Sequence, residues 1–123
     1  MKILGTGVDL VEVPRFERSI RQWGKRFLKR IFTAGELAYA EKNKSRAQHL
    51  AVRFAAKEAV VKALGAPKGL GLEWKDLEII HASSGQPRVR FHGTMKRWNR
   101  YEVHLSLTHT TGYAVATAVV CRP

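Results

Sequence analysis

Acidic residues, cysteine and long apolar runs are all scarce in this 123-residue chain. It holds 10 Asp and Glu against 22 Lys and Arg, so its formal net charge is +12. The single Cys121 excludes an intrachain disulfide and favours a reducing compartment. No apolar run approaches the roughly 20 residues of a membrane span, and Asp9 interrupts the apolar start that a signal peptide would need. We therefore expect a cytoplasmic protein with no membrane partner.

The excess of basic residues predicts an acidic partner. Nucleic acid, an anionic membrane surface, an acidic protein and a phosphorylated small molecule all fit a charge of +12. A basic surface that only keeps the protein in solution is the alternative. Composition alone does not choose among these partners.

The order of sequence patterns indicates one domain spanning residues 1–123. Apolar residues make up 45% of the chain, and no linker or internal repeat divides it. Strands are predicted over 2–13, 76–80, 88–92, 102–109 and 113–121, helices over 14–30, 33–41, 46–65 and 93–101, and a loop over 68–72. This order is typical of an α+β fold in which helices cover one face of an antiparallel sheet.

Local signals set the boundaries of the first two helices. Pro14 suits a first helical turn, and Gly24 predicts a break. The "TAGE" segment has the form of a capping box, so Thr33 is expected to begin a helix. Within 14–30 the basic residues are expected outside, and an apolar stripe is expected to face the core: Phe16, Ile20, Trp23, Phe27 and Leu28.

Two carboxylates are candidates for a shared site. Alternation along the first strand places Gly5, Gly7 and Asp9 on one face, and glycine in a strand often marks close approach of another backbone. Glu58 and Lys62 are four residues apart on one face of an alanine-rich helix. If these faces met, Asp9 and Glu58 would repel unless they shared a proton or a cation such as Mg²⁺. The alternative is a solvent-exposed Glu58–Lys62 ion pair.

The histidines support no metal site by their spacing. His109 ends a strand and shares the apolar face of that strand, so it is either a satisfied core residue or a functional group. The other four histidines show no spacing of metal ligands, and one cysteine makes a zinc site improbable.

Three segments together resemble a known family. "GTGVDLVEVPRFE", "RFAAKEAVVKALG" and "LSLTHTTGYAVATAVV" are similar to the signature segments of holo-acyl-carrier-protein synthases, the short, single-domain 4′-phosphopantetheinyl transferases. The similarity includes "FTAGE", "WKDLEI" and "GQP" and runs in order from about residue 3 to 120. It implies Mg²⁺-dependent transfer of the phosphopantetheine arm of coenzyme A to a serine of apo acyl carrier protein, with release of adenosine 3′,5′-bisphosphate.

The resemblance also implies roles for individual residues. Asp9 and Glu58 would bind Mg²⁺, and Lys62 would lie by the pyrophosphate as a cation and candidate proton donor. Glu58 is a candidate catalytic residue, although the group that accepts the serine proton stays open. The other residues implied to bind coenzyme A are Lys44, Arg46 and Arg53 at phosphates, His109 at the nucleotide end, and Gly85 and Pro87 by the adenine.

The same family resemblance implies two kinds of partner. Acyl carrier proteins are acidic, so the basic helix would dock them through Arg15, Arg18, Arg21 and Arg26, although these could instead form only a solvated face. The short family members are homotrimers with active sites between subunits. The main alternative function is a small nucleic-acid-binding module, and a catalytically dead protein that only binds carrier protein is another. If the chain is a transferase, we expect no nucleic-acid partner.

Overall fold

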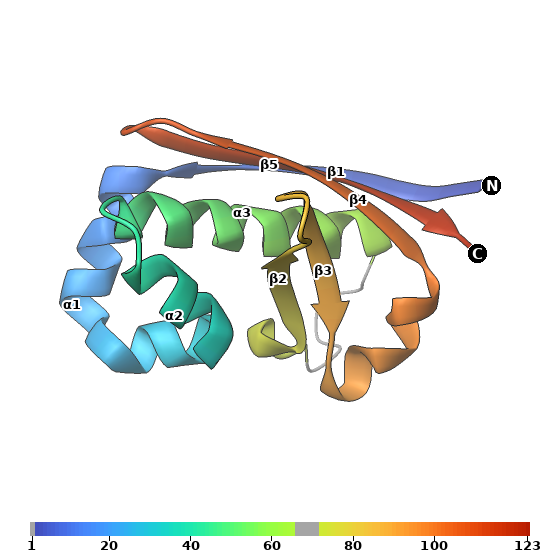
Figure 1. Ribbon diagram of the computed structural model, residues 1–123, viewed down its shortest axis with the longest axis horizontal. Coiled ribbons are helices and arrows are strands. Elements are labelled where there is room, and N and C mark those ends of the chain that lie inside the picture. Colours follow the sequence, from blue (N-terminus) through green and yellow to red (C-terminus); the bar gives the residue numbers. More distant parts are fainter. Residues whose placement is uncertain (1, 66–71) are drawn as a thin grey trace.

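The computed structural model describes residues 2–65 and 72–123 (Figure 1). In chain order the elements are β1 (Lys2–Glu12), α1 (Val13–Ile31), α2 (Ala34–Glu41), α3 (Arg46–Leu64), η1 (Trp74–Asp76), β2 (Leu77–His81), β3 (Pro87–Phe91), η2 (Gly93–Arg100), β4 (Glu102–His109) and β5 (Tyr113–Arg122). The predicted loop over 68–72 lies almost wholly outside the described residues. Every other predicted helix and strand is present, although 93–100 forms a 3₁₀ helix.

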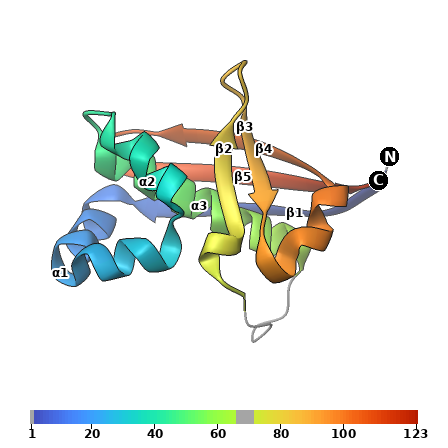
Figure 2. The ribbon, with the colours of Figure 1, turned by 60° about the horizontal axis from the view of Figure 1, so that its bottom comes forward.

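The strands form two antiparallel sheets. β1, β5 and β4 make a three-stranded sheet in the order β1-β5-β4, and β2 pairs with β3 in a hairpin. The register places Ala116 of β5 opposite Asp9 of β1 and Ala114 opposite His109 of β4. Figure 2 shows the hairpin crossing in front of the larger sheet, with α2 beside it. The sequence indicated the strands but not their division into two sheets.

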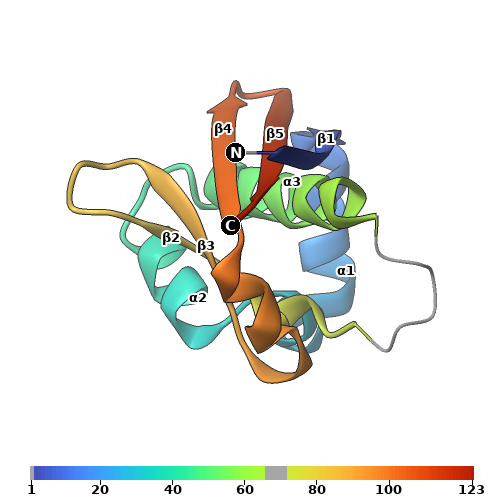
Figure 3. The same cartoon turned by 90° about the vertical axis from the view of Figure 1, so that its right-hand side faces the viewer.

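Helix α3 is the centre of the molecule. Figure 3 looks along it and shows the three-stranded sheet on one side, α1 on one flank, and α2 with the β2–β3 hairpin on the other. A helix covered on several sides needs small or apolar residues around most of its circumference. Eleven of its residues are buried, and five of these are alanines. No helix in the described part of the chain is long and apolar enough to cross a membrane.

Glycines in β1 allow the close approach that the sequence predicted. A Cβ atom on Gly5 would collide with the carbonyl oxygen of Ala63, and one on Gly7 would collide with that of Ala59. The strand therefore rests directly on the backbone of α3. This contact fixes the depth of Asp9 relative to the helix.

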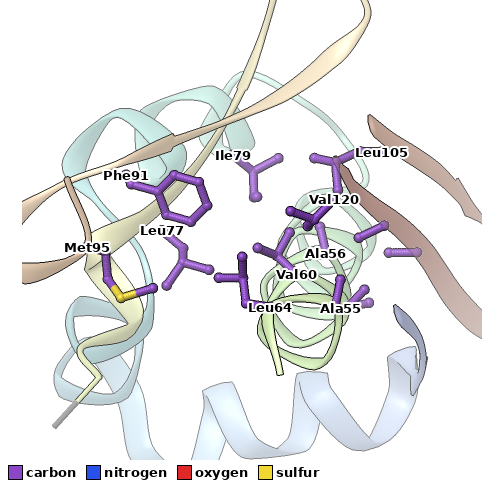
Figure 4. Packing of buried hydrophobic residues seen from close by; sticks show 14 residues of the cluster. Ala55, Ala56, Val60, Leu64, Leu77, Ile79, Phe91, Met95, Leu105 and Val120 are labelled. Atoms are coloured by element: carbon purple, nitrogen blue, oxygen red, sulfur yellow. The ribbon is translucent and has the colours of Figure 1, made fainter. Parts of the chain in front are cut away.

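The main core lies between α3, the larger sheet and the hairpin. Figure 4 shows Val60 of α3 among Leu77, Ile79 and Phe91 of the hairpin, with Val120 from the sheet close by. A second cluster under α1 and α2 is centred on Phe16, whose ring stacks at 5.6 Å on Phe54. These contacts hold α3 in one orientation, which the site described below requires.

The helix boundaries follow the local signals, with one exception in α1. Thr33 and Glu36 form the predicted capping box at the start of α2. Gly24 adopts φ 65°, which interrupts α1 as predicted. Trp23, expected in the apolar stripe, is instead 61% exposed. Trp23 immediately precedes the non-helical Gly24, so it lies at the end of a helical segment and not within a continuous stripe.

Candidate active site

The predicted acidic pair lies where β1 crosses α3. Asp9 points towards the helix, and its Oδ1 accepts a hydrogen bond from Lys62 Nζ at 3.2 Å. Lys62 also donates to the carbonyl oxygen of Val8 at 2.9 Å. Asp9 is 18% exposed in its side chain and Lys62 is 52% exposed, so the pair is open to a ligand from solvent. The predicted meeting of strand face and helix face is thus present.

Glu58 completes this group. Its pKa lies above the usual value because burial disfavours the charged carboxylate and the negative charge of Asp9 acts in the same direction. Lys62 opposes both effects. The two carboxylates, with the single ammonium of Lys62 beside them, form a site that lacks positive charge.

The donor set fits a magnesium ion. Mg²⁺ is commonly held by one or two carboxylates, with waters and substrate phosphates supplying the other oxygens. Asp9 and Glu58 are such a pair. Within the described ranges 2–65 and 72–123 no group of three or more His, Cys, Asp and Glu could hold a metal. A metal ion that needs three or more such protein ligands would therefore find no site among these residues.

Arg53 and His109 lie on the opposite flank of α3. Successive helical residues are about 100° apart, so Arg53 is displaced from Glu58 by about 140° around the axis. His109 Nδ1 lies 2.9 Å from Gln48 Oε1, near the start of α3. Arg53 is only 1% exposed, with Nη1 donating to the carbonyl oxygen of His49 at 3.3 Å. One chain therefore does not bring these two residues to the Asp9–Glu58 pair.

Lys44 and Arg46 line an open cleft at the start of α3. The cleft has a volume of about 540 Å³, and Glu17 and Arg21 of α1 form its other wall. Arg46 is partly engaged, because its Nε donates to Glu41 Oε1 at 2.7 Å. The predicted phosphate contacts thus meet one of the predicted docking arginines.

The remaining predicted residues are accessible. Gly85, with φ 87°, forms the turn of the β2–β3 hairpin, and Pro87 begins β3 directly opposite His81. The four arginines proposed for docking all lie exposed along α1, and one of them, Arg21, pairs with Glu17 at 3.6 Å: Arg15, Arg18, Arg21 and Arg26.

A comparison with protein families decides the classification. A sequence profile of the 4′-phosphopantetheinyl transferase superfamily matches residues 5–118. The chain belongs to this superfamily. It is therefore a transferase that acts in phosphopantetheinyl transfer, as the three signature segments indicated.

Relatives of this transferase match over nearly the whole chain. The holo-[acyl-carrier-protein] synthase of Solibacter usitatus (strain Ellin6076) is 41% identical over 122 residues, covering 96% of this chain and 98% of that protein. A holo-(acyl-carrier-protein) synthase from Bacillus anthracis str. Ames in complex with CoA (3′,5′-ADP) is 31% identical, covers all of both chains and superposes with a TM-score of 0.83. The synthase of Neisseria meningitidis is 30% identical, with a TM-score of 0.86 and 96% and 98% coverage. The predicted α+β class is confirmed.

Sequence reasoning missed a buried ion pair in this transferase. Lys57 Nζ donates to Glu36 Oε1 at 2.7 Å and to the carbonyl oxygens of Ile31 and Trp74 at 2.6 and 3.1 Å. Glu36 Oε2 accepts from the backbone N–H of Ile79 at 2.9 Å. The pair joins α1, α2, α3, η1 and β2, and Lys57 directly precedes Glu58 in α3. The capping box gave a signal for Glu36, but nothing local paired it with Lys57.

Proposed function

We propose that this chain transfers the phosphopantetheine arm of coenzyme A to a serine of apo acyl carrier protein, releasing adenosine 3′,5′-bisphosphate. The observation that carries the proposal is the convergence of Asp9, Glu58 and Lys62 where β1 rests on α3. The names of the relatives, and the coenzyme A complex of one of them, supply the substrate class. The single domain over residues 1–123 would act in the cytoplasm.

Asp9 and Glu58 would hold Mg²⁺ in this reaction. The bound ion would neutralise charge on the pyrophosphate, which is a main requirement of phosphoryl transfer. Lys62 donates hydrogen bonds to Asp9 and Val8, and these would hold it beside the pyrophosphate. Its ammonium would compensate charge on the leaving phosphate and could give that group a proton. Glu58, with its raised pKa, is the candidate to accept the serine proton.

The remaining coenzyme A contacts would come from a second copy of the chain. Arg53 and His109 occupy the flank of α3 opposite Glu58, so a ligand that meets both groups must lie between copies. We propose a homotrimer that meets this need. The outer face of the larger sheet supports an interface, because Val8, Leu10 and Tyr113 are 57%, 59% and 54% exposed there. Lys44, Arg46, Gly85 and Pro87 would complete the pocket for coenzyme A.

The basic face of α1 would receive the acidic carrier protein. Arg15, Arg18, Arg21 and Arg26 are all exposed along this helix, and exposed charges of one sign chiefly raise the rate of encounter with a partner of opposite charge. The exposed Trp23 would add an apolar contact to the same surface.

Intact-mass spectrometry of an apo acyl carrier protein tests the proposal. The carrier protein is incubated with this chain, coenzyme A and Mg²⁺, and the control contains EDTA. We expect a gain of one phosphopantetheine that EDTA abolishes, and that Asp9→Asn and Glu58→Gln greatly reduce. No gain with several carrier proteins would refute the transfer, and a gain unaffected by EDTA would refute the metal site.

A further inference from the structure

Three imidazoles gather on the flank of α3 that faces away from Glu58. The rings of His49 on α3 and His109 on β4 are 5.2 Å apart between centroids. His81 of β2 presents Nδ1 to Arg53 Nη2 at 3.1 Å. Tyr39 of α2 stacks on the His81 ring at 5.2 Å with an angle of 8° between planes, and it covers the Arg53 guanidinium at 4.2 Å. We call these five residues the histidine cluster.

The histidine cluster is rich in groups that can carry positive charge. Burial lowers the pKa of His49, and His109, Arg53 and His81 lower it further. Burial also lowers the pKa of His81, and Arg53 adds to that effect. Arg53, His109 and Tyr39 are the other titratable members of the cluster. In the free protein the two imidazoles are therefore neutral near physiological pH.

Glu36 is the carboxylate whose charge acts on this cluster, and it is already paired with Lys57. Glu36 acts on Arg53 from α2, but its Oε1 lies 2.7 Å from the buried ammonium of Lys57. Glu36 therefore leaves the cluster with a deficit of negative charge. An anion that entered from solvent would meet this deficit.

Arg53 gives independent evidence for a missing acceptor. Its guanidinium is buried, and Nη1 and Nη2 have partners in His49 and His81. Among the described residues, Arg53 Nε is the buried side-chain nitrogen or oxygen that lacks a hydrogen-bond partner. Buried polar groups in native proteins are nearly always hydrogen-bonded, so an unpartnered one calls for a ligand, a water or an ion.

We propose that His49 and His81 form, with Arg53, a phosphate site that takes up a proton when the phosphate binds. The proposal rests on the transferase function proposed above and adds a pH-dependent step to its nucleotide binding. A phosphate dianion beside an imidazole favours the charged form, so the bound state has the higher histidine pKa. The site is weak for a phosphate while both imidazoles are neutral and becomes stronger once one of them is protonated.

The direction in which affinity changes with pH distinguishes proton uptake by the protein from protonation of the ligand's own phosphate. Because the ligand raises the histidine pKa, affinity rises as pH falls through the pKa of the complex and levels off below that of the free protein. One fully linked proton changes the affinity about tenfold per pH unit. The phosphomonoester itself is protonated with a pKa of about 6, and that titration weakens binding as pH falls. A gain in affinity between mildly alkaline and neutral pH therefore comes from the protein.

Isothermal titration calorimetry with adenosine 3′,5′-bisphosphate measures the proton uptake directly. The full-length protein is titrated in EDTA, near neutral pH, in PIPES and in Tris, whose heats of ionisation differ. We expect uptake of about half to one proton in the wild type. The double variant His49→Gln/His81→Gln should take up little or none and bind several-fold more weakly, while His92→Gln, outside the cluster, should match the wild type.

An NMR titration and the carrier-protein assay complement the calorimetry. Imidazole NMR titrations of the wild type should show the pKa of His49 and His81 rising when the nucleotide binds, which needs no variant to fold. No proton uptake by the wild type, or equal uptake by the double variant, would overturn the proposal. If the same preparation still modifies apo acyl carrier protein, only this inference fails; if it does not, the transferase function fails separately.

Discussion

Replacement of Gly7 by alanine tests the contact that fixes Asp9 against α3. The new Cβ would collide with the carbonyl oxygen of Ala59 and lie 3.0 Å from the backbone N of Ala63. Both are backbone atoms of a buried helix, so the strand must move. Overpacking of this kind costs up to about 3 kcal/mol, and the smaller unfolded-state entropy of alanine returns about 1 kcal/mol. We therefore expect Gly7→Ala to destabilise the fold by about 2 kcal/mol.

Gly112→Ala is the matched control, because no atom lies within 4 Å of its added Cβ. Thermal unfolding of both variants at one protein concentration should lower the midpoint for Gly7→Ala by roughly 6–10 °C and leave Gly112→Ala near the wild type. Transfer activity at a temperature where all three remain folded should fall for Gly7→Ala, since Asp9 follows the strand away from Glu58. An unchanged midpoint for Gly7→Ala would refute the close approach.

Three other predictions follow from buried and surface charges. Lys57→Met leaves the Glu36 carboxylate buried without its ammonium and should cost about 3–5 kcal/mol in urea unfolding; if Lys57→Met/Glu36→Gln is no more stable, the pair is not the cause. Glu58→Gln should raise the unfolding midpoint of the metal-free protein at neutral pH, and the gain should vanish as pH falls through the raised pKa of Glu58, where the wild-type carboxyl also becomes neutral; a gain that persists in acid contradicts this. Arg15→Glu/Arg26→Glu should raise KM for acyl carrier protein roughly tenfold at low salt and less at high salt, and an equal rise in KM for coenzyme A would argue against docking.

The sequence was most informative where a signal is local. The capping box at Thr33, the break at Gly24 and the alternation that turns Asp9 towards the helix each depend on residues a few positions apart, and each is present in the structure. The family segments then supplied the transferase class, which pattern alone could not.

Interactions between distant segments were beyond the reach of the patterns. Glu36 meets the N–H of Ile79 only after β2 has packed beside α2, a separation of 43 residues. His81 meets Arg53 across 28 residues, and histidine spacing gave no sign of it. The sequence placed Arg53 and Glu58 in one long helix but did not show which flank of that helix each would face. The structure shows that they lie on opposite flanks of α3.

The central claim is that the two flanks of α3 supply halves of one site shared between copies of the chain. Co-expression of Glu58→Gln chains with His109→Ala chains tests it most directly, after each variant alone has been shown to be impaired. In randomly mixed trimers about one quarter of the sites would combine an intact Glu58 with an intact His109 from a neighbour. We expect recovery of about a quarter of wild-type transfer activity; activity no greater than that of the two separate variants would contradict a site shared between copies.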